Sequence, residues 1–126
     1  MPMQRKGGSV TEGQPGDVLQ AEVHLRVLRA LEANPEISQR QLAAVLGISL
    51  GKTNYCLRAL IAAGSVKVRN FRRSNNKLAY AYYLTAKGLD QQARLTVSFL
   101  KRKRAEFELL AREIAELDDE VRRLGS

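Results

Sequence analysis

Apolar residues in the first third of the chain recur at the spacing of an amphipathic helix. The pattern starts after Asp17, a suitable N-cap, and stops at Asn34 and Pro35. It is carried by Leu19, Val23, Val27, Leu28 and Leu31. Residues 1–16, which precede this helix, are polar and rich in glycine, so we expect a flexible tail there.

Two short helices joined by a glycine turn are predicted next. Ser38 and Gln41 have the spacing of a capping box, which marks the start of a helix. Gly47 ends that helix because it permits the left-handed backbone of a sharp turn, and Ser49 is placed to cap a third helix that reaches Ala63. This order of elements indicates a helix-turn-helix.

After residue 64 the spacing changes to the strict alternation of half-buried strands. Val66 and Val68 belong to the first run, and every second residue from Leu78 to Leu84 is Leu or Tyr. The polar link between the runs, Ser-Asn-Asn-Lys, tolerates turn conformations. The two runs predict a β-hairpin with a basic tip over Arg72–Lys77, which beside a helix-turn-helix is a wing.

The last segment is predicted to be one long helix with an apolar stripe. Thr85 can cap it, and no proline interrupts it before about Leu124, so it would span about 60 Å. From Phe107 onward the apolar steps alternate between three and four, as in a heptad repeat. We expect two copies of the chain to dimerise through Leu100, Phe107, Leu110, Ile114, Leu117, Val121 and Leu124. The alternative is that the stripe docks on the chain's own domain, and the flanking charges leave parallel and antiparallel pairing open.

These elements predict a mainly α fold with a small β-hairpin. The expected organisation is a tail over residues 1–16, a winged helix-turn-helix over 17–84 and a coiled-coil-like dimerisation helix over 85–126. The chain of 126 residues is long enough for one such core and its appendages.

Charge indicates a polyanionic partner. The net charge is +8, and it is unevenly spread, because residues 1–104 hold 18 basic and 6 acidic side chains while residues 105–126 hold 3 and 7. No acidic residue lies between Glu36 and Asp90. A face that merely aids solubility usually mixes both signs, so this acid-free stretch favours nucleic acid as the partner.

The sequence gives little support for a metal-binding protein, an enzyme or a membrane protein. Cys56 and His24 are the only cysteine and histidine, too few for a disulfide or a structural zinc site, and Cys56 is expected to pack as a small hydrophobe rather than act as a redox sensor. No catalytic set of residues is visible, so we predict neither an enzyme nor a cofactor. No membrane span or signal peptide is recognisable, which leads us to expect a cytoplasmic protein.

The outer face of the third predicted helix carries side chains suited to reading DNA bases. Lys52 lies in the first turn, where the helix dipole disfavours a cation unless a phosphate or a guanine offsets it. Asn54 can pair with adenine, and Gly51 allows a close approach. The alternative is that these are idle surface residues. We predict base contacts by Leu50, Gly51, Lys52, Asn54, Tyr55 and Arg58.

A second set of residues is predicted to hold the DNA backbone. These residues lie at the two helix starts, along the first strand and in the wing, and the basic ones among them should make binding weaken steeply with salt. They are Ser38, Arg40, Ser49, Lys67, Arg69, Arg72, Arg73, Asn75, Asn76 and Lys77.

The chain resembles the winged helix-turn-helix of MarR-type transcriptional regulators over about Val18 to Leu100. The likeness rests on NPEISQRQLAAVLGISLGKTNYCLRALIAAGSV, the basic wing and YYLTAKG. Three runs, ISLGKTNYCLRALI, KVRNFRRSNNKLAYAYYLT and ARLTVSFLKRK, are similar to a MarR subgroup of exopolysaccharide-associated regulators. The resemblance implies a dimeric regulator of exopolysaccharide genes, with Leu50–Arg58 in the major groove and Arg72–Lys77 at the adjacent minor groove.

The sequence thus predicts a homodimer that binds a pseudo-palindromic operator on double-stranded DNA, with its two reading helices ~34 Å apart. A protein-interaction module that recruits a partner through the long helix is the alternative, and binding of structured RNA is a third. The operator sequence, the direction of regulation and the existence of a small-molecule effector are left open.

Overall fold

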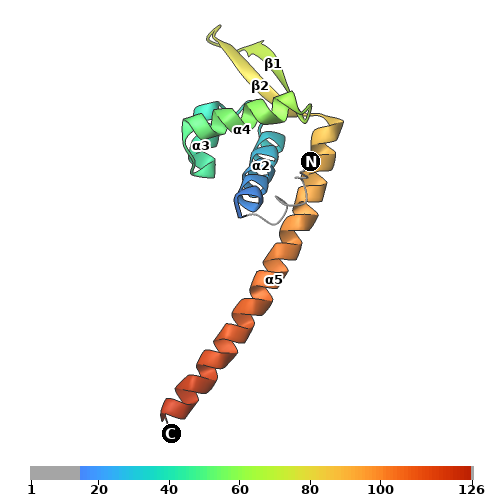
Figure 1. Ribbon diagram of the computed structural model, residues 1–126. Coiled ribbons are helices and arrows are strands. Elements are labelled where there is room, and N and C mark those ends of the chain that lie inside the picture. Colours follow the sequence, from blue (N-terminus) through green and yellow to red (C-terminus); the bar gives the residue numbers. More distant parts are fainter. Residues whose placement is uncertain (1–14, 126) are drawn as a thin grey trace, which may run out of the picture. The chain divides into compact units, whose positions relative to one another are not determined.

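The computed structural model describes residues 15–125 and is mainly helical (Figure 1). The predicted tail lies outside the described residues, except that Pro15 and Gly16 already belong to the first helix. The helix therefore starts three residues before Val18, the first helical residue predicted, since proline suits a first helical turn. Asp17 lies inside the helix, so its prediction as the N-cap is wrong. In chain order the elements are α2 (Pro15–Ala33), α3 (Gln39–Leu46), α4 (Leu50–Ala62), β1 (Val66–Arg72), β2 (Leu78–Leu84) and α5 (Ala86–Gly125).

The capping residues expected from the sequence define the turn between α3 and α4. Ser38 Oγ accepts a hydrogen bond from Gln41 N at 3.0 Å, and Gln41 Oε1 accepts one from Ser38 N at 3.0 Å, which completes the capping box. Gly47 ends α3 with a φ of 70°, in the left-handed region. Ser49 Oγ then accepts from Lys52 N at 3.0 Å and caps α4. These local predictions are confirmed.

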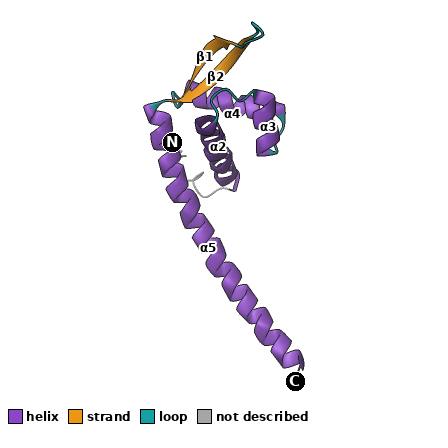
Figure 2. Ribbon diagram, turned by 180° about the vertical axis from the view of Figure 1, so that it is seen from behind, coloured by secondary structure: helices purple, strands orange, loops and turns teal. Residues whose placement is uncertain are grey.

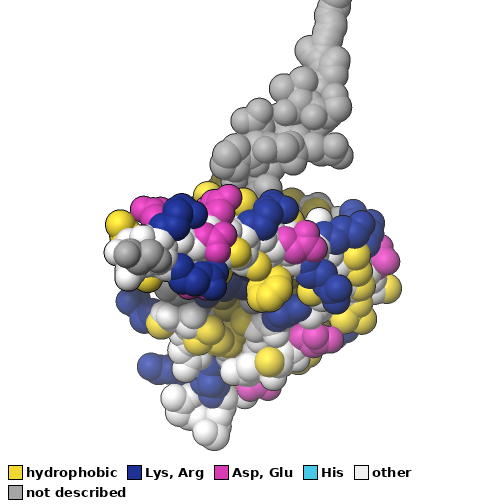
Figure 3. Space-filling model, turned by 90° about the horizontal axis from the view of Figure 1, so that it is seen from below, with side chains coloured by type: hydrophobic (Ala, Val, Ile, Leu, Met, Phe, Trp, Pro, Cys, Tyr) yellow, Lys and Arg dark blue, Asp and Glu magenta, His cyan; other side chains and the backbone are white. Residues whose placement is uncertain are grey.

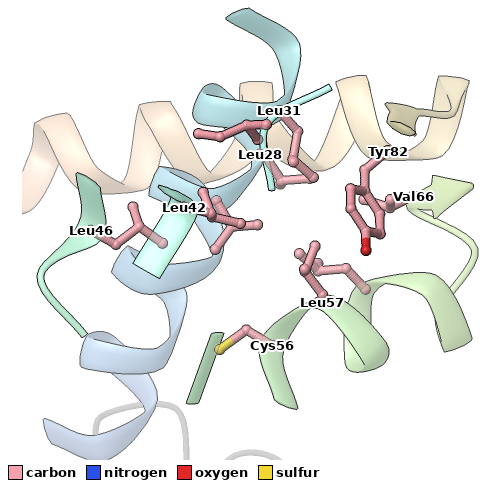
Figure 4. Close-up of a cluster of buried hydrophobic side chains, with 11 residues drawn as sticks. Leu28, Leu31, Leu42, Leu46, Cys56, Leu57, Val66 and Tyr82 are labelled. Carbon is pink, nitrogen blue, oxygen red and sulfur yellow. The ribbon is translucent and has the colours of Figure 1, made fainter. Parts of the chain in front are cut away.

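One apolar core joins the three short helices to the hairpin. Figure 4 shows its side chains converging from α2, α3, α4 and both strands. Because the buried stripes of all three helices meet here, the backbone of α4 is held from one side and its opposite face is left to solvent. The labelled members are Leu28, Leu31, Leu42, Leu46, Cys56, Leu57, Val66 and Tyr82.

The strands form an antiparallel pair that extends beyond this core. The register runs from Val66 opposite Leu84 to Arg72 opposite Leu78. Alternation alone would bury Leu78 and Tyr80 with Tyr82, yet these two side chains are 54% and 51% exposed. The hairpin is longer than the helical layer that it packs on, so its outer half has nothing to cover it.

The first turns of α5 are anchored to the junction between α4 and β1. Thr85 Oγ1 accepts from Gly88 N at 3.1 Å, as predicted for its cap, and donates to the carbonyl of Gly64 at 2.6 Å. Ser65 Oγ donates to Gln91 Oε1 at 2.5 Å. A compact unit ends at Leu95, and α5 continues without a break through a second unit from Thr96 onward (Figure 2). No described helix is long and apolar enough to cross a membrane.

Candidate nucleic-acid interface

The outer face of α4 holds the six residues predicted to read bases. Five of them are exposed, whereas Asn54 is half-buried. The opposite face packs into the core through Thr53, Cys56, Leu57 and Leu60. The burial of one stripe fixes the direction of the other, so the exposed set points away from the domain as one surface. Its members are Leu50, Gly51, Lys52, Tyr55 and Arg58.

Asn54 is held by a chain of side-chain hydrogen bonds that joins three elements. Its Nδ2 donates to Gln39 Oε1 on α3 at 3.1 Å. Gln39 Nε2 in turn donates to the hydroxyl of Tyr82 on β2 at 3.2 Å. The Asn54 amide keeps its carbonyl and one N–H for a ligand, and its orientation is fixed before any ligand arrives.

Gln39 and Tyr82 were not among the residues predicted for the site. Gln39 is separated from Asn54 by 15 positions and from Tyr82 by 43, so no local pattern connects the three residues. The helix-turn-helix pattern is the one signal in the sequence that points to this contact. In such a motif the two helices cross, so Gln39 on α3 can lie close to Asn54 on α4.

Lys52 stands in an electrostatic setting that favours an anion. It lies in the first turn of α4, where the helix dipole is positive and no acidic side chain is present. Burial raises the pKa of the Cys56 thiol, while the nearby charge of Lys52 acts in the opposite direction. Cys56 is 2% exposed and stays a protonated core side chain. Its predicted role as a small hydrophobe agrees with this packing.

Gly51 has open space around it. A Cβ added at this position would meet no atom within 4 Å, so folding of the domain does not require glycine here. A glycine on an exposed helix is less favourable than alanine by about 1 kcal/mol. Its presence on this face is consistent with close approach of a ligand to the backbone.

The wing is a tight basic turn with two oriented arginines. Asn76 has a φ of 65°, and its N–H donates to the carbonyl of Arg73 at 2.8 Å. Arg72 Nη1 donates to the carbonyl of Asn76 at 3.1 Å, and Arg73 stacks over Phe71 at 5.5 Å from the ring centre. Asn75 Oδ1 accepts from the N–H of Lys77 at 3.1 Å. All residues from Arg72 to Lys77 are exposed.

A surface hollow brings the start of α3 and the wing together. It has a volume of about 220 Å³ and is lined by Ser38, Gln39, Arg73, Tyr80 and their neighbours. Two of the residues predicted for the DNA backbone, Ser38 and Arg73, thus share one concave surface.

The remaining members of that set are more scattered. Arg40 is exposed on α3, and Ser49 is exposed beside α4 but accepts a hydrogen bond as its cap. Lys67 and Arg69 are also exposed, and they alternate with Val66, so they lie on the hairpin face opposite the core.

Charges of both signs occur elsewhere on the molecule. The face seen in Figure 3 mixes Lys and Arg with Asp and Glu side chains. By contrast, α3, α4 and the hairpin all lie within the acid-free stretch between Glu36 and Asp90. Among residues 15–125, no three His, Cys, Asp or Glu side chains are grouped so that they could hold a metal ion.

Comparison with known proteins identifies the fold. Residues 20–67, from α2 to the start of β1, match a family model described as winged helix-turn-helix DNA-binding. The chain has a winged-helix fold. The predicted fold class is confirmed, and α4 is the second helix of its helix-turn-helix.

Solved structures share the winged-helix fold over most of the chain. The PcaV transcriptional regulator of Streptomyces coelicolor has a TM-score of 0.55 and 20% identity, with 91% of this chain and 98% of that chain covered. A transcriptional regulator homologue from Pyrococcus horikoshii has a TM-score of 0.56 and 19% identity, with 76% and 94% covered. A MarR/EmrR family regulator from an Acinetobacter species has a TM-score of 0.52 and 18% identity, with 79% and 75% covered. No curated protein matches the sequence.

Proposed function

We propose that this protein is a transcriptional regulator that binds double-stranded DNA in a sequence-specific manner through α4. The observation that carries the proposal is the outer face of α4, where Lys52, Asn54, Tyr55 and Arg58 stand together in a stretch free of acidic residues. The matching family model describes DNA-binding winged helices, which supports the same function. A helix of this kind presents its N-terminal residues to base edges in the major groove.

The two sets of residues have different tasks in this proposal. Leu50, Gly51, Lys52, Asn54, Tyr55 and Arg58 face the bases, and Asn54 contacts adenine with its fixed amide. Arg40, Arg69, Arg72, Arg73 and Lys77 neutralise phosphates or enter the minor groove, helped by Ser38, Ser49, Lys67, Asn75 and Asn76. Binding therefore depends on salt through the second set and on sequence through the first.

The protein acts in the cytoplasm as a homodimer on a pseudo-palindromic operator. Its sequence resembles exopolysaccharide-associated regulators of the MarR type, which supports genes of exopolysaccharide synthesis as its targets. The exposed stripe of α5, described below, supports self-association.

Selection from random duplex DNA at near-physiological salt tests the proposal. The purified protein should enrich an inverted repeat, with half-sites about one helical turn apart. Enrichment of a single half-site would retain sequence-specific binding and remove the dimer from the proposal. Binding that is sensitive to salt but enriches no sequence would contradict the role of α4.

Two alanine variants separate the tasks of the two sets. Asn54→Ala should relax the preference at one base position by about 1–3 kcal/mol, because a base contact is lost. Arg73→Ala should weaken binding to the selected site and to random DNA alike, because a phosphate contact carries no sequence information. Equal losses on both DNAs for both variants would refute this division.

The exposed stripe of α5 favours a second candidate function, a module that recruits another protein. In that case the winged helix would be a scaffold, and DNA would not be retained even at ~50 mM salt. Retention of DNA under this condition decides against it.

A further inference from the structure

The C-terminal part of α5 exposes a continuous row of large apolar side chains. Exposure of the six residues ranges from 51% for Ile114 to 80% for Leu124. Single apolar residues are common on surfaces, but a regular row along a helix marks a contact face. The row consists of Phe107, Leu110, Ile114, Leu117, Val121 and Leu124.

The chemistry of the row matches a two-stranded coiled coil. Phe107, Ile114 and Val121 are seven residues apart and occupy position a of the heptad, whereas Leu110, Leu117 and Leu124 occupy position d. In parallel coiled coils, β-branched residues at a and leucine at d favour two strands over three or four. Two of the three a positions and all three d positions follow this rule.

The flanking charges discriminate between the two orientations. Position g is glutamate in three successive heptads, at Glu106, Glu113 and Glu120. Antiparallel helices place g beside g of the partner, so in every register that overlaps these heptads glutamates would face glutamates. Parallel helices place g beside position e of the next heptad, which is occupied by Ala111, Asp118 and Gly125. Only the contact between Glu113 and Asp118 is then repulsive.

The pairing has a defined start. Lys103 occupies the d position before Phe107, and its ammonium group bonds Glu106 at 3.2 Å and lies 5.1 Å from the ring centre of Phe99. Its neighbours Lys101, Arg102 and Arg104 are also basic. Two such runs repel each other, so we expect close packing of parallel helices to begin at Phe107 and to leave out Leu100, which was predicted from the sequence to belong to the stripe.

We propose that residues 107–124 pair with the same segment of a second copy as a parallel, in-register two-stranded coiled coil. The inference deepens the proposed homodimer and relies on that function for the identity of the partner.

Reversal of one charge beside the apolar row, at position g or e, tests whether the two helices are parallel or antiparallel. In a parallel pair, Glu113→Lys or Asp118→Lys turns both repulsive contacts into attractive ones and should tighten dimerisation about 3- to 10-fold. The double variant, which carries both substitutions, places lysine opposite lysine and should lose that gain.

An antiparallel pair of the full row gives a different result for the same variants. Glu113 then faces Glu120 of the other copy, whereas Asp118 faces Ala111. Asp118→Lys would therefore change little, and the double variant would keep the gain of Glu113→Lys.

Glu116→Lys is the matched control, because it makes the same change of net charge at position c, away from the apolar row. Sedimentation equilibrium of the full chain gives the dissociation constant for each variant. A gain for the control as large as that for Asp118→Lys would overturn the proposal, and so would the absence of a gain for Asp118→Lys.

A disulfide provides a second readout that does not depend on electrostatics. In a chain whose Cys56 is replaced by Ala, Leu117→Cys should cross-link to its own copy on oxidation, because parallel d positions meet. Asp119→Cys, on the far side of the helix, is the control and should not. Cross-linking of a mixture of Leu117→Cys and Ile114→Cys chains, without cross-linking of either alone, would demonstrate antiparallel pairing.

The outcomes separate this inference from the proposed DNA binding. A chain that is monomeric at all concentrations and still selects a DNA sequence would overturn the coiled coil alone. A parallel dimer that selects no DNA sequence would overturn the DNA-binding function alone.

Discussion

At the scale of single residues, Gln39 decides how Asn54 is presented. Its amide accepts from Asn54 and donates to Tyr82, so one side chain connects α3, α4 and β2. The residue needs no contact with DNA to influence which base is preferred. It acts as a positioning residue for the proposed reading of bases.

Gln39→Ala is expected to reduce the ratio of specific to random DNA affinity about 2- to 10-fold, the effect of one typical hydrogen bond. Asn54 then samples several rotamers before it binds. Affinity for random DNA should be unchanged, because no phosphate contact is lost. Tyr82→Phe is the control, since it leaves the bond between Gln39 and Asn54 in place and should have a smaller effect. Competition binding with selected and scrambled duplexes measures both ratios, and an unchanged ratio for Gln39→Ala would contradict this role.

Gly51→Ala should separate stability from binding. A methyl group fits the open space at this position, and removal of a helical glycine stabilises the fold by up to about 1 kcal/mol. The same methyl group would stand between α4 and the floor of the groove, so affinity for the selected operator should fall. Thermal unfolding and operator binding of the same preparation test the two effects. A stabilised variant with full affinity would show that DNA does not approach the helix closely at this point.

The structural residues that could be predicted from the sequence have hydrogen-bond partners close to them along the chain, whereas the residue that was missed, Gln39, has partners far away along the chain. Ser38, Gln41, Gly47 and Thr85 act within one helical turn, so spacing along the chain was enough to predict them. The partners of Gln39 come from two other elements, and such contacts exist only once the helices have crossed. The exposure of most of the proposed reading side chains could be predicted because the outer face of one helix is also a local property, whereas their role stays a prediction.

At the scale of elements, the attachment of α5 depends on one glycine. Gly88 is the buried residue of this helix and faces the carbonyl of Ser65, against which an added Cβ would collide. Lys87 Nζ also donates to the carbonyl of Ala63 at 2.6 Å. These contacts fix the first turns of α5 to the end of α4, the proposed reading helix.

Gly88→Ala should therefore destabilise the domain by about 1–3 kcal/mol, the usual cost of overpacking. Gly125→Ala is the matched control at the other end of the same helix, where an added Cβ meets nothing within 4 Å. Denaturant unfolding followed by circular dichroism measures both free energies. Equal stability of the two variants would mean that the helix shifts away from Ser65 without loss.

The elements themselves could be predicted well, except for the depth of the hairpin. Alternation indicates which residues share a face of a strand, and Val66 and Tyr82 are buried accordingly. It does not indicate how far the helices beneath extend, and this is why Leu78 and Tyr80 lie in solvent. How much of a strand is covered depends on the helices that pack against it. The sequence of the strand alone does not contain this information.

At the scale of the whole molecule, His24 should make stability depend on pH. Burial lowers its pKa below the ordinary value of 6.5. Its Nε2 is buried and makes no hydrogen bond with the described residues. The unfolded chain therefore takes up a proton at a higher pH than the folded chain, and the free energy of unfolding falls as the pH decreases below about 6.5.

His24→Gln should flatten this part of the pH dependence, because the glutamine side chain carries no proton that titrates in this range. Urea unfolding at pH 7.5 and pH 5.5 gives the difference for each protein. A wild-type protein that is equally stable at both values would show that His24 gains a compensating contact on protonation.

The division of charge described above also limits how many duplexes one molecule can hold. Residues 1–104 carry +12 and residues 105–126 carry −4, so phosphate attracts one part of the chain and repels the other. The acidic segment therefore disfavours a second duplex, and the protein should occupy a site without bridging or condensing DNA.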